Sequence, residues 1–226
     1  MRMTKSYRFS PVGSALLSAA MTFLGLSSVP MVTASEQEAP AAISKEDLAA
    51  DNALFLGIAR KALKWDEKAE PSKIVGPLYY VGTAGLASYL FVTDEGYILF
   101  NTGMPDSGPL IVESIRALGF DPKRIKIMIN GHGHSDHAGA FAYFKQLTGA
   151  QLAVMEAEVA MVEDGGKSDF HYGHDWQIMG QPPVKVDRVL RDGDTVRLGE
   201  VILTARHTPG HTRGSTTWET VLTQDG

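Results

Sequence analysis

Three histidines and one aspartate stand within six consecutive residues of this 226-residue chain, in the stretch NGHGHSDHAG at residues 130–139. A packed core would not accommodate this cluster without a strong partner, because buried polar groups need compensating interactions. The apolar run at 125–129 is typical of a buried strand, and a helical pattern follows from about 138 to 147. The cluster is therefore predicted to lie where a strand leads into a helix.

The spacing within the cluster indicates metal binding. His132 and His134 are two residues apart, so in extended backbone both side chains point the same way and can bind one ion together. Asp136 and His137 are adjacent and must diverge, which suits a second ion beside the first. Nitrogen and oxygen ligands favour zinc, with iron and manganese as alternatives. A solvated polar loop is the competing interpretation, but the flanking strand and helix favour a metal site.

A catalytic zinc site typically has three protein ligands and an open position for water, so a third ligand is needed beside His132 and His134. His211, in HTPGHTRGSTTW, is the best candidate, because Pro-Gly tightens its loop and small neighbours allow close backbone approach. His207 shares this loop, but it lies four residues away across Pro-Gly and need not face the same direction.

Residues 163–183 form a long segment rich in glycine, aspartate and histidine, which is typical of a functional flap or surface loop. His171 and His174 lie in it. We interpret them as solvated loop histidines that could line a substrate groove, and as the first alternatives if a further metal ligand is required.

The first 34 residues have the pattern of a signal peptide. Arg2, Lys5 and Arg8 precede an apolar run at 14–32, and Val-Thr-Ala at 32–34 resembles a cleavage site before Ser35. A membrane anchor is the alternative, but serines interrupt the run and a span needs about 20 mostly apolar residues. We expect export to the periplasm, without stable membrane association.

The composition limits the number of domains and the kinds of ligand expected for the chain that remains after residue 34. At 44% hydrophobic residues, the length suits one domain, expected at 35–226. Removing the leader takes away three basic residues and no acid, so the net charge falls from −5 to −8, which excludes a typical nucleic-acid binder. The absence of cysteine excludes disulfides and thiolate ligands.

Hydrophobic periodicity predicts a layered α/β fold, because strands and helices alternate in the middle of the chain. A first helix is expected at 45–63, because a capping box at 44–47 precedes it and Leu48, Phe55, Ile58 and Ala62 recur on one face. A second is expected at 109–118, followed by Gly119. A third is expected near 138–147, and a short fourth helix ends at 162. Strands are expected at 78–81, 87–92, 97–100, 125–129, 151–154, 184–190, 195–198, 201–205 and 216–223, the last running into an Asp-Gly hairpin signal at 225–226.

At the histidines the chain resembles the metallo-β-lactamase superfamily, whose signature H-x-H-x-D-H is present at 132–137 with His211 downstream. The segments GMPDSGPLIVESIRALGFDP, INGHGHSDHAGA, PPVKVDRVLRDGDTVRLG and TPGHTRGSTTW resemble the third subclass of zinc metallo-β-lactamases, from about Leu54 to the last residue. The resemblance implies an αββα sandwich and a small-molecule β-lactam substrate.

The resemblance also implies roles for individual residues. His132, His134 and His211 would bind the first zinc, Asp136 and His137 would supply two of the second zinc's three protein ligands, and Asp136 would orient the nucleophile. A zinc-bound hydroxide would attack the lactam carbonyl. A lactone or thioester hydrolase of the same superfamily, or an inactive zinc-binding fragment, is the alternative.

Three departures from the family pattern affect these expectations. Asn101 stands where the family commonly has an aspartate, so an acceptor is kept and a charge is lost. Gly131 and Gly133 are expected to make the ligand loop more flexible. The resemblance implies that the family's last zinc ligand would lie beyond Gly226. On this basis we expect a chain that lacks the C-terminal part, with one well-formed zinc site and little or no hydrolysis.

Overall fold

The computed structural model describes residues 45–223, with side chains from residue 52 onward. The expected signal peptide, its cleavage site, the capping serine at 44 and the Asp-Gly turn at 225–226 lie outside the described residues. The first described element is helix α1 (Lys45–Ala62), close to the predicted range. None of the helices within residues 45–223 has both the length and the hydropathy of a membrane-spanning segment.

A seven-stranded sheet forms the centre of the fold, with its strands in chain order. Pairing is antiparallel from β1 to β4 and parallel from β4 to β7. The predicted hairpin between β3 and β4 is present, with Thr93 paired to Gly96. The strands are β1 (Ser72–Val75), β2 (Leu78–Tyr80), β3 (Tyr89–Thr93), β4 (Gly96–Phe100), β5 (Ile125–Ile129), β6 (Gln151–Met155) and β7 (Arg188–Leu190).

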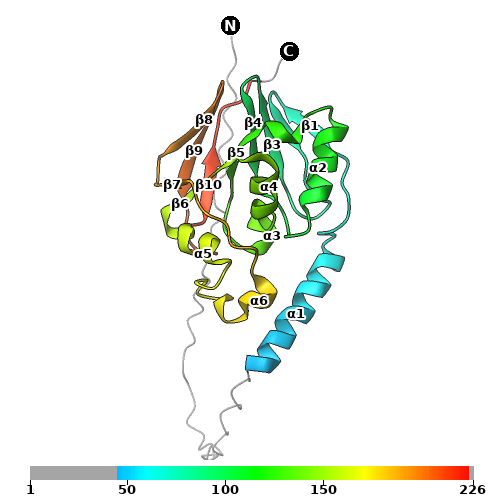
Figure 1. The fold of residues 1–226 in the computed structure, drawn as a ribbon, viewed down its shortest axis with the longest axis vertical. Helices are drawn as coiled ribbons and strands as arrows, with labels where there is room; N and C mark the ends of the chain where they lie inside the picture. The colour runs from blue at the N-terminus through cyan, green and yellow to red at the C-terminus, as the bar shows by residue number, and fades with distance from the viewer. Residues whose placement is uncertain (1–44, 224–226) are drawn as a thin grey trace, which may run out of the picture. The chain divides into compact units, whose positions relative to one another are not determined.

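Helices cover one face of this sheet. Phe141 and Phe144 of α4, together with Ile111 and Ile115 of α2, are buried against strand residues such as Leu99, forming the first core. Figure 1 shows α2 and α4 on this side. The remaining helices are α2 (Gly108–Ala117), α3 (Ser135–Ala138), α4 (Phe141–Thr148), α5 (Val159–Asp164) and α6 (Trp176–Met179), with 3-10 turns at Pro122–Arg124, Glu156–Glu158 and Gly173–Asp175.

A second, three-stranded sheet packs on the other face. It consists of β8 (Thr195–Leu198), β9 (Val201–His207) and β10 (Thr216–Glu219), in the order β10-β9-β8. Leu203 and Ala205 of β9 pack with Ile98 and Ile129 of the large sheet, forming the second core (Figure 1). The predicted α/β sandwich is confirmed as helix, sheet and sheet layers. Within residues 45–223 no helix covers the outer face of the small sheet, where Ile202 is 43% exposed.

Several predicted boundaries are wrong. The helix expected at 138–147 is two helices, and α3 already begins at Ser135, so Asp136 and His137 lie on a helix. The strand expected at 184–190 is reduced to β7, because Val184 donates to the backbone carbonyl of Val162 in α5 and not to a strand. The flap is partly helical, since it contains α6.

Candidate metal centre

Three neighbouring elements position the histidine cluster. β5 ends at Ile129, and the chain then turns through His132 to His134, whose extended backbone opens α3. His211 lies on the loop between β9 and β10, far away in sequence. A backbone hydrogen bond connects the His132–His134 loop to the end of the His211 loop, because the Thr216 N–H donates to the Gly131 carbonyl at 2.7 Å. This junction brings the downstream histidine to the cluster.

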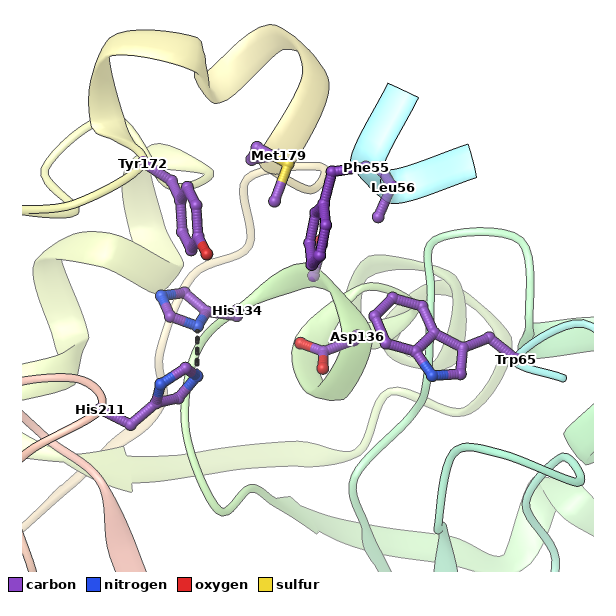
Figure 2. Close-up of a pocket in the computed structure, with 9 residues that line it drawn as sticks. Phe55, Leu56, Trp65, His134, Asp136, Tyr172, Met179 and His211 are labelled. Atoms are coloured by element: carbon purple, nitrogen blue, oxygen red, sulfur yellow. Dashed lines mark hydrogen bonds between the residues drawn. The ribbon is translucent and has the colours of Figure 1, made fainter. Parts of the chain in front are cut away.

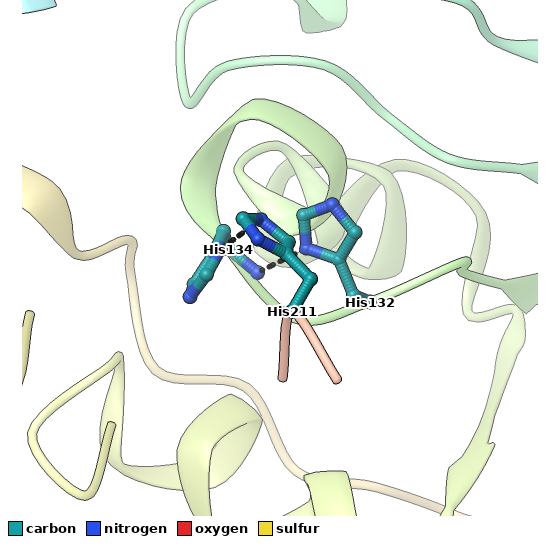
Figure 3. A group of neighbouring side chains, drawn as sticks. All are labelled: His132, His134 and His211. Atoms are coloured by element: carbon teal, nitrogen blue, oxygen red, sulfur yellow. Dashed lines mark hydrogen bonds between the residues drawn. The ribbon is translucent and has the colours of Figure 1, made fainter. Parts of the chain in front are cut away.

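His132, His134 and His211 converge into one group, with a ligand nitrogen from each within 4.8 Å of the others. The ring centroids lie 4.7 to 5.0 Å apart, and His134 Nδ1 lies 3.0 Å from His211 Nε2 (Figure 3). Three imidazoles facing a common point, with no cysteine nearby, form a donor set that suits a zinc site with an open position.

The surroundings of His132 favour its neutral, metal-binding form. Burial, followed by the neighbouring imidazoles of His137, His134 and His211, lowers the pKa of His132 to about 2. The ring is therefore neutral at physiological pH. Because a metal binds only the deprotonated imidazole, no proton has to leave His132 before coordination.

Stability of the metal-free protein should fall as pH decreases below about 6.5. The folded pKa of His132 lies below its unfolded value, so the unfolded state binds the extra proton between the two values. The loss should approach about 1.4 kcal/mol per pH unit, and burial lowers the pKa of His137 in the same sense. Urea unfolding at pH 7.5, 6.5 and 5.5 with chelator measures it. His132→Asn should flatten the slope, and an unchanged slope would contradict the assignment.

A carboxylate in the flap orients His134. Asp169 Oδ2 lies 2.8 Å from His134 Nε2 and only accepts, so Nε2 carries the proton and Nδ1 keeps its lone pair for a metal. Burial opposes the charge of Asp169, but backbone N–H groups of Tyr172 and His171, with His134, outweigh it and lower its pKa. Sequence reasoning missed Asp169, because it lies 35 residues from His134 in a segment without a recognisable motif.

A second group consists of His132, Asp136 and His137. Among the described residues, the buried Nδ1 of His137 has no hydrogen-bond partner, and Asp136 Oδ2 lies 3.5 Å from its Nε2. The His132 Nδ1 accepts from the His134 backbone N–H at 3.3 Å. Only one His132 nitrogen therefore remains, and the two groups compete for it.

The competition predicts unequal affinities for two metal equivalents. Once His132 completes the first group, the described residues offer the second ion only Asp136 and His137. We expect the second zinc to bind at least 10-fold more weakly than the first, since one fewer ligand weakens a site by more than 1.4 kcal/mol. Titration against a chromophoric chelator separates the two steps. Two equivalents bound with equal affinity would contradict this prediction.

The remaining histidines take no part in either group. His207 is the last residue of β9, not a loop residue as predicted, and its Nε2 lies 2.8 Å from the Arg213 carbonyl. His174 pairs with Asp175 at 3.0 Å, and His171 packs on Tyr172. The flap therefore contributes Asp169 and Tyr172 to the site, whereas its two histidines stay at the surface.

The three residues that depart from the family pattern, Asn101, Gly131 and Gly133, all lie at or beside the loop that carries His132 and His134. The buried Asn101, with φ of 60°, accepts from the Gly131 N–H at 3.0 Å, so its acceptor supports the ligand loop. A Cβ on Gly131 would make ordinary contact with the Phe100 ring at 3.8 Å, but a Cβ on Gly133 would lie 2.6 Å from Met161 Cε and 3.0 Å from Glu158 Oε1. Gly133 thus permits close packing, which was not expected from its flexibility alone.

A pocket opens directly beside the group. His134, Ser135, Asp136 and His211 provide its polar side. Figure 2 shows Asp136 on its helix below, Phe55 and Leu56 reaching in from α1, and Tyr172 above His134. The apolar wall is completed by Trp65 and Met179. The site can therefore bring an activated water against a small molecule with an apolar substituent.

Comparison with known proteins agrees with this geometry. A family model described as the metallo-beta-lactamase superfamily matches residues 83–222, which is more than half of the chain. The native FEZ-1 metallo-beta-lactamase of Legionella gormanii is 46% identical, with a TM-score of 0.68, over 70% of this chain and 60% of that one. The class B3 di-zinc metallo-beta-lactamase LRA-12 from an Alaskan soil metagenome is 40% identical, with a TM-score of 0.67, over 71% and 60%.

Curated relatives include other activities. The N-acyl homoserine lactonase AttM of Agrobacterium fabrum is 35% identical over 107 residues, covering 44% of this chain and 39% of that protein. The chain spans less than half the length of the first curated relatives that it matches, and about 60% of the two solved structures above.

Proposed function

This chain belongs to the metallo-β-lactamase superfamily, and from that premise we propose that it is a zinc-dependent hydrolase that opens the β-lactam ring of antibiotics. The observation that carries the proposal is the likeness to solved β-lactamases, at 46% identity over 70% of the chain. The lactonase relative matches a shorter part of the chain at lower identity.

The donor set supports zinc as the metal. His132, His134 and His211 supply only imidazole nitrogen, and Asp169 fixes the tautomer of His134 so that Nδ1 faces the group. Zinc bound there would act as a Lewis acid and lower the pKa of a water molecule to about 7. The unpaired nitrogen of His137 and the Asp136 carboxylate fit a second, weaker ion.

The chain's own residues would bind and orient the reactants. Asp136 lines the pocket beside His134 and His211, where a carboxylate can accept a hydrogen bond from the attacking water and hold it toward the substrate carbonyl. Phe55, Trp65 and the other apolar side chains of the pocket would cover an apolar substituent and exclude bulk water. Hydrolysis adds one water across the amide bond, giving a carboxylate and an amine.

Hydrolysis of lactones or thioesters is the second candidate, favoured by the lactonase relative and by the apolar wall. A substrate panel separates the candidates. The zinc-loaded protein would be assayed with imipenem, benzylpenicillin and nitrocefin, beside an N-acyl homoserine lactone and an acyl-CoA thioester. We expect slow turnover of the β-lactams that chelator abolishes and zinc restores, because the described residues offer the second ion only Asp136 and His137 beside the first group. Turnover of the lactone or thioester alone would overturn the proposal.

We also propose that the enzyme acts in the periplasm, where it would protect a Gram-negative host from β-lactams. The basic start, apolar run and Val-Thr-Ala site support export. N-terminal sequencing of protein from a periplasmic fraction should give Ser35 as the first residue. Retention of Met1 in the cytoplasmic fraction would contradict export.

A further inference from the structure

A buried carboxylate lies behind the candidate metal centre, outside both metal groups. Glu158 ends the 3-10 turn after β6 and is 1% exposed. Its Oε1 accepts from the Gly133 N–H at 2.5 Å, and its Oε2 accepts from the Gly214 N–H at 2.7 Å. One carboxylate thereby connects the two loops that carry the histidines, since Gly133 lies between His132 and His134 and Gly214 lies three residues after His211.

Both contacts depend on glycine at the donor position. A Cβ on Gly214 would lie 2.5 Å from Glu158 Oε2 and 2.6 Å from the Glu158 backbone nitrogen. A Cβ on Gly133 would lie 3.0 Å from Oε1. The three residues therefore fit together as one unit, although they come from separate segments of the chain.

A carboxylate buried to this extent must have its charge compensated by other groups, because burying an uncompensated charge costs free energy. In the described part of the chain, Glu158 forms no ion pair with Lys, Arg or His. Two backbone N–H groups compensate its charge, and hydrogen bonds to a carboxylate are stronger than neutral ones. Other contacts hold the same loop, including Gln181 Nε2 donating to the Gly133 carbonyl at 2.8 Å.

We propose that Glu158 is a positioning residue of the metal centre, which fixes the distance between the His132–His134 loop and the His211 loop so that three imidazoles meet one ion. It acts through backbone and touches neither metal nor substrate. The inference rests on the proposed metal site and is independent of which substrate is hydrolysed.

The test is metal binding by Glu158→Gln. The amide keeps the shape but presents an NH₂ group to one of the two N–H donors, so one loop is released. We expect zinc affinity, measured by chelator competition, to fall about 10- to 100-fold, and the visible spectrum of the cobalt-substituted protein to change. Glu156→Gln is the matched control, because Glu156 lies on the same turn, is exposed and pairs with Arg191. It should leave both readouts unchanged.

A glycine pair gives a second test that keeps the carboxylate. Gly133→Ala should displace Glu158 and weaken zinc binding, because the added Cβ would lie 3.0 Å from Glu158 Oε1 as well as 2.6 Å from the movable end of Met161. Gly131→Ala should not, since the nearest atom beyond its chain neighbours would lie 3.8 Å from the added Cβ. Zinc affinity and cobalt spectra unchanged in Glu158→Gln, or equal effects of the two alanines, would overturn the inference alone. Failure of the unmodified protein to bind zinc would overturn the proposed function together with it.

Discussion

Replacing His134 by alanine should abolish tight binding of the first zinc. The variant leaves His132 and His211 as the only members of the first group. If about 10 to 16 kcal/mol of binding free energy is shared by the three protein ligands, losing one costs about 3 to 5 kcal/mol, so affinity should fall more than 100-fold. Elemental analysis after dialysis against a weak chelator measures the zinc content per chain.

His207→Ala is the control for this prediction. His207 belongs to the same downstream segment as His211, but its Nε2 lies against the Arg213 carbonyl at the surface. We expect its zinc content to match that of the unmodified protein. Equal zinc content in the His134 and His207 variants would refute the assignment of the first group.

Replacing Asp136 by asparagine should remove most hydrolysis while leaving the first zinc in place. Asp136 lines the pocket but is not a member of the first group. Asparagine keeps the size of the side chain and loses the charge with which Asp136 would accept a hydrogen bond from the attacking water. Loss of a carboxylate that acts on the proton of a reacting group typically costs about 10²- to 10⁴-fold in rate, and kcat for the β-lactam hydrolysed fastest is the quantity to measure.

Asp106→Asn is the matched control, since Asp106 is an exposed carboxylate that pairs with Arg60 outside the pocket. Its kcat should equal that of the unmodified protein. If Asp136→Asn retained full kcat with zinc bound, the proposed role of Asp136 would be wrong. If it lost the first zinc as well, the separation of the two metal groups would be wrong.

The spacing of the histidines allowed much of the centre to be predicted. His132 and His134 follow a buried strand, and His211 lies in a tight turn, so local patterns indicated all three. Asp169 and Glu158 were missed, because tertiary folding alone brings them to the histidine loop, from 35 and 25 residues away. A carboxylate in a flap or a short turn carries no periodic signal of its own.

The fold shows the same division between local and tertiary information. Strands with strong apolar runs, such as β5, were predicted at their observed bounds. β1 was missed, because its four residues are mostly exposed and lack alternation. The apolar spacing of α1 predicted the helix but not its use, since Phe55 is 53% exposed and faces the pocket.

Three imidazoles from two loops distant in sequence form the proposed site of the first zinc. Anomalous diffraction at the zinc edge, from crystals of the protein with one equivalent of zinc, tests it most directly. We expect the strongest peak within bonding distance, about 2.0 to 2.1 Å, of one nitrogen from each of His132, His134 and His211. A strongest peak that lacks any one of these three nitrogens would contradict the account.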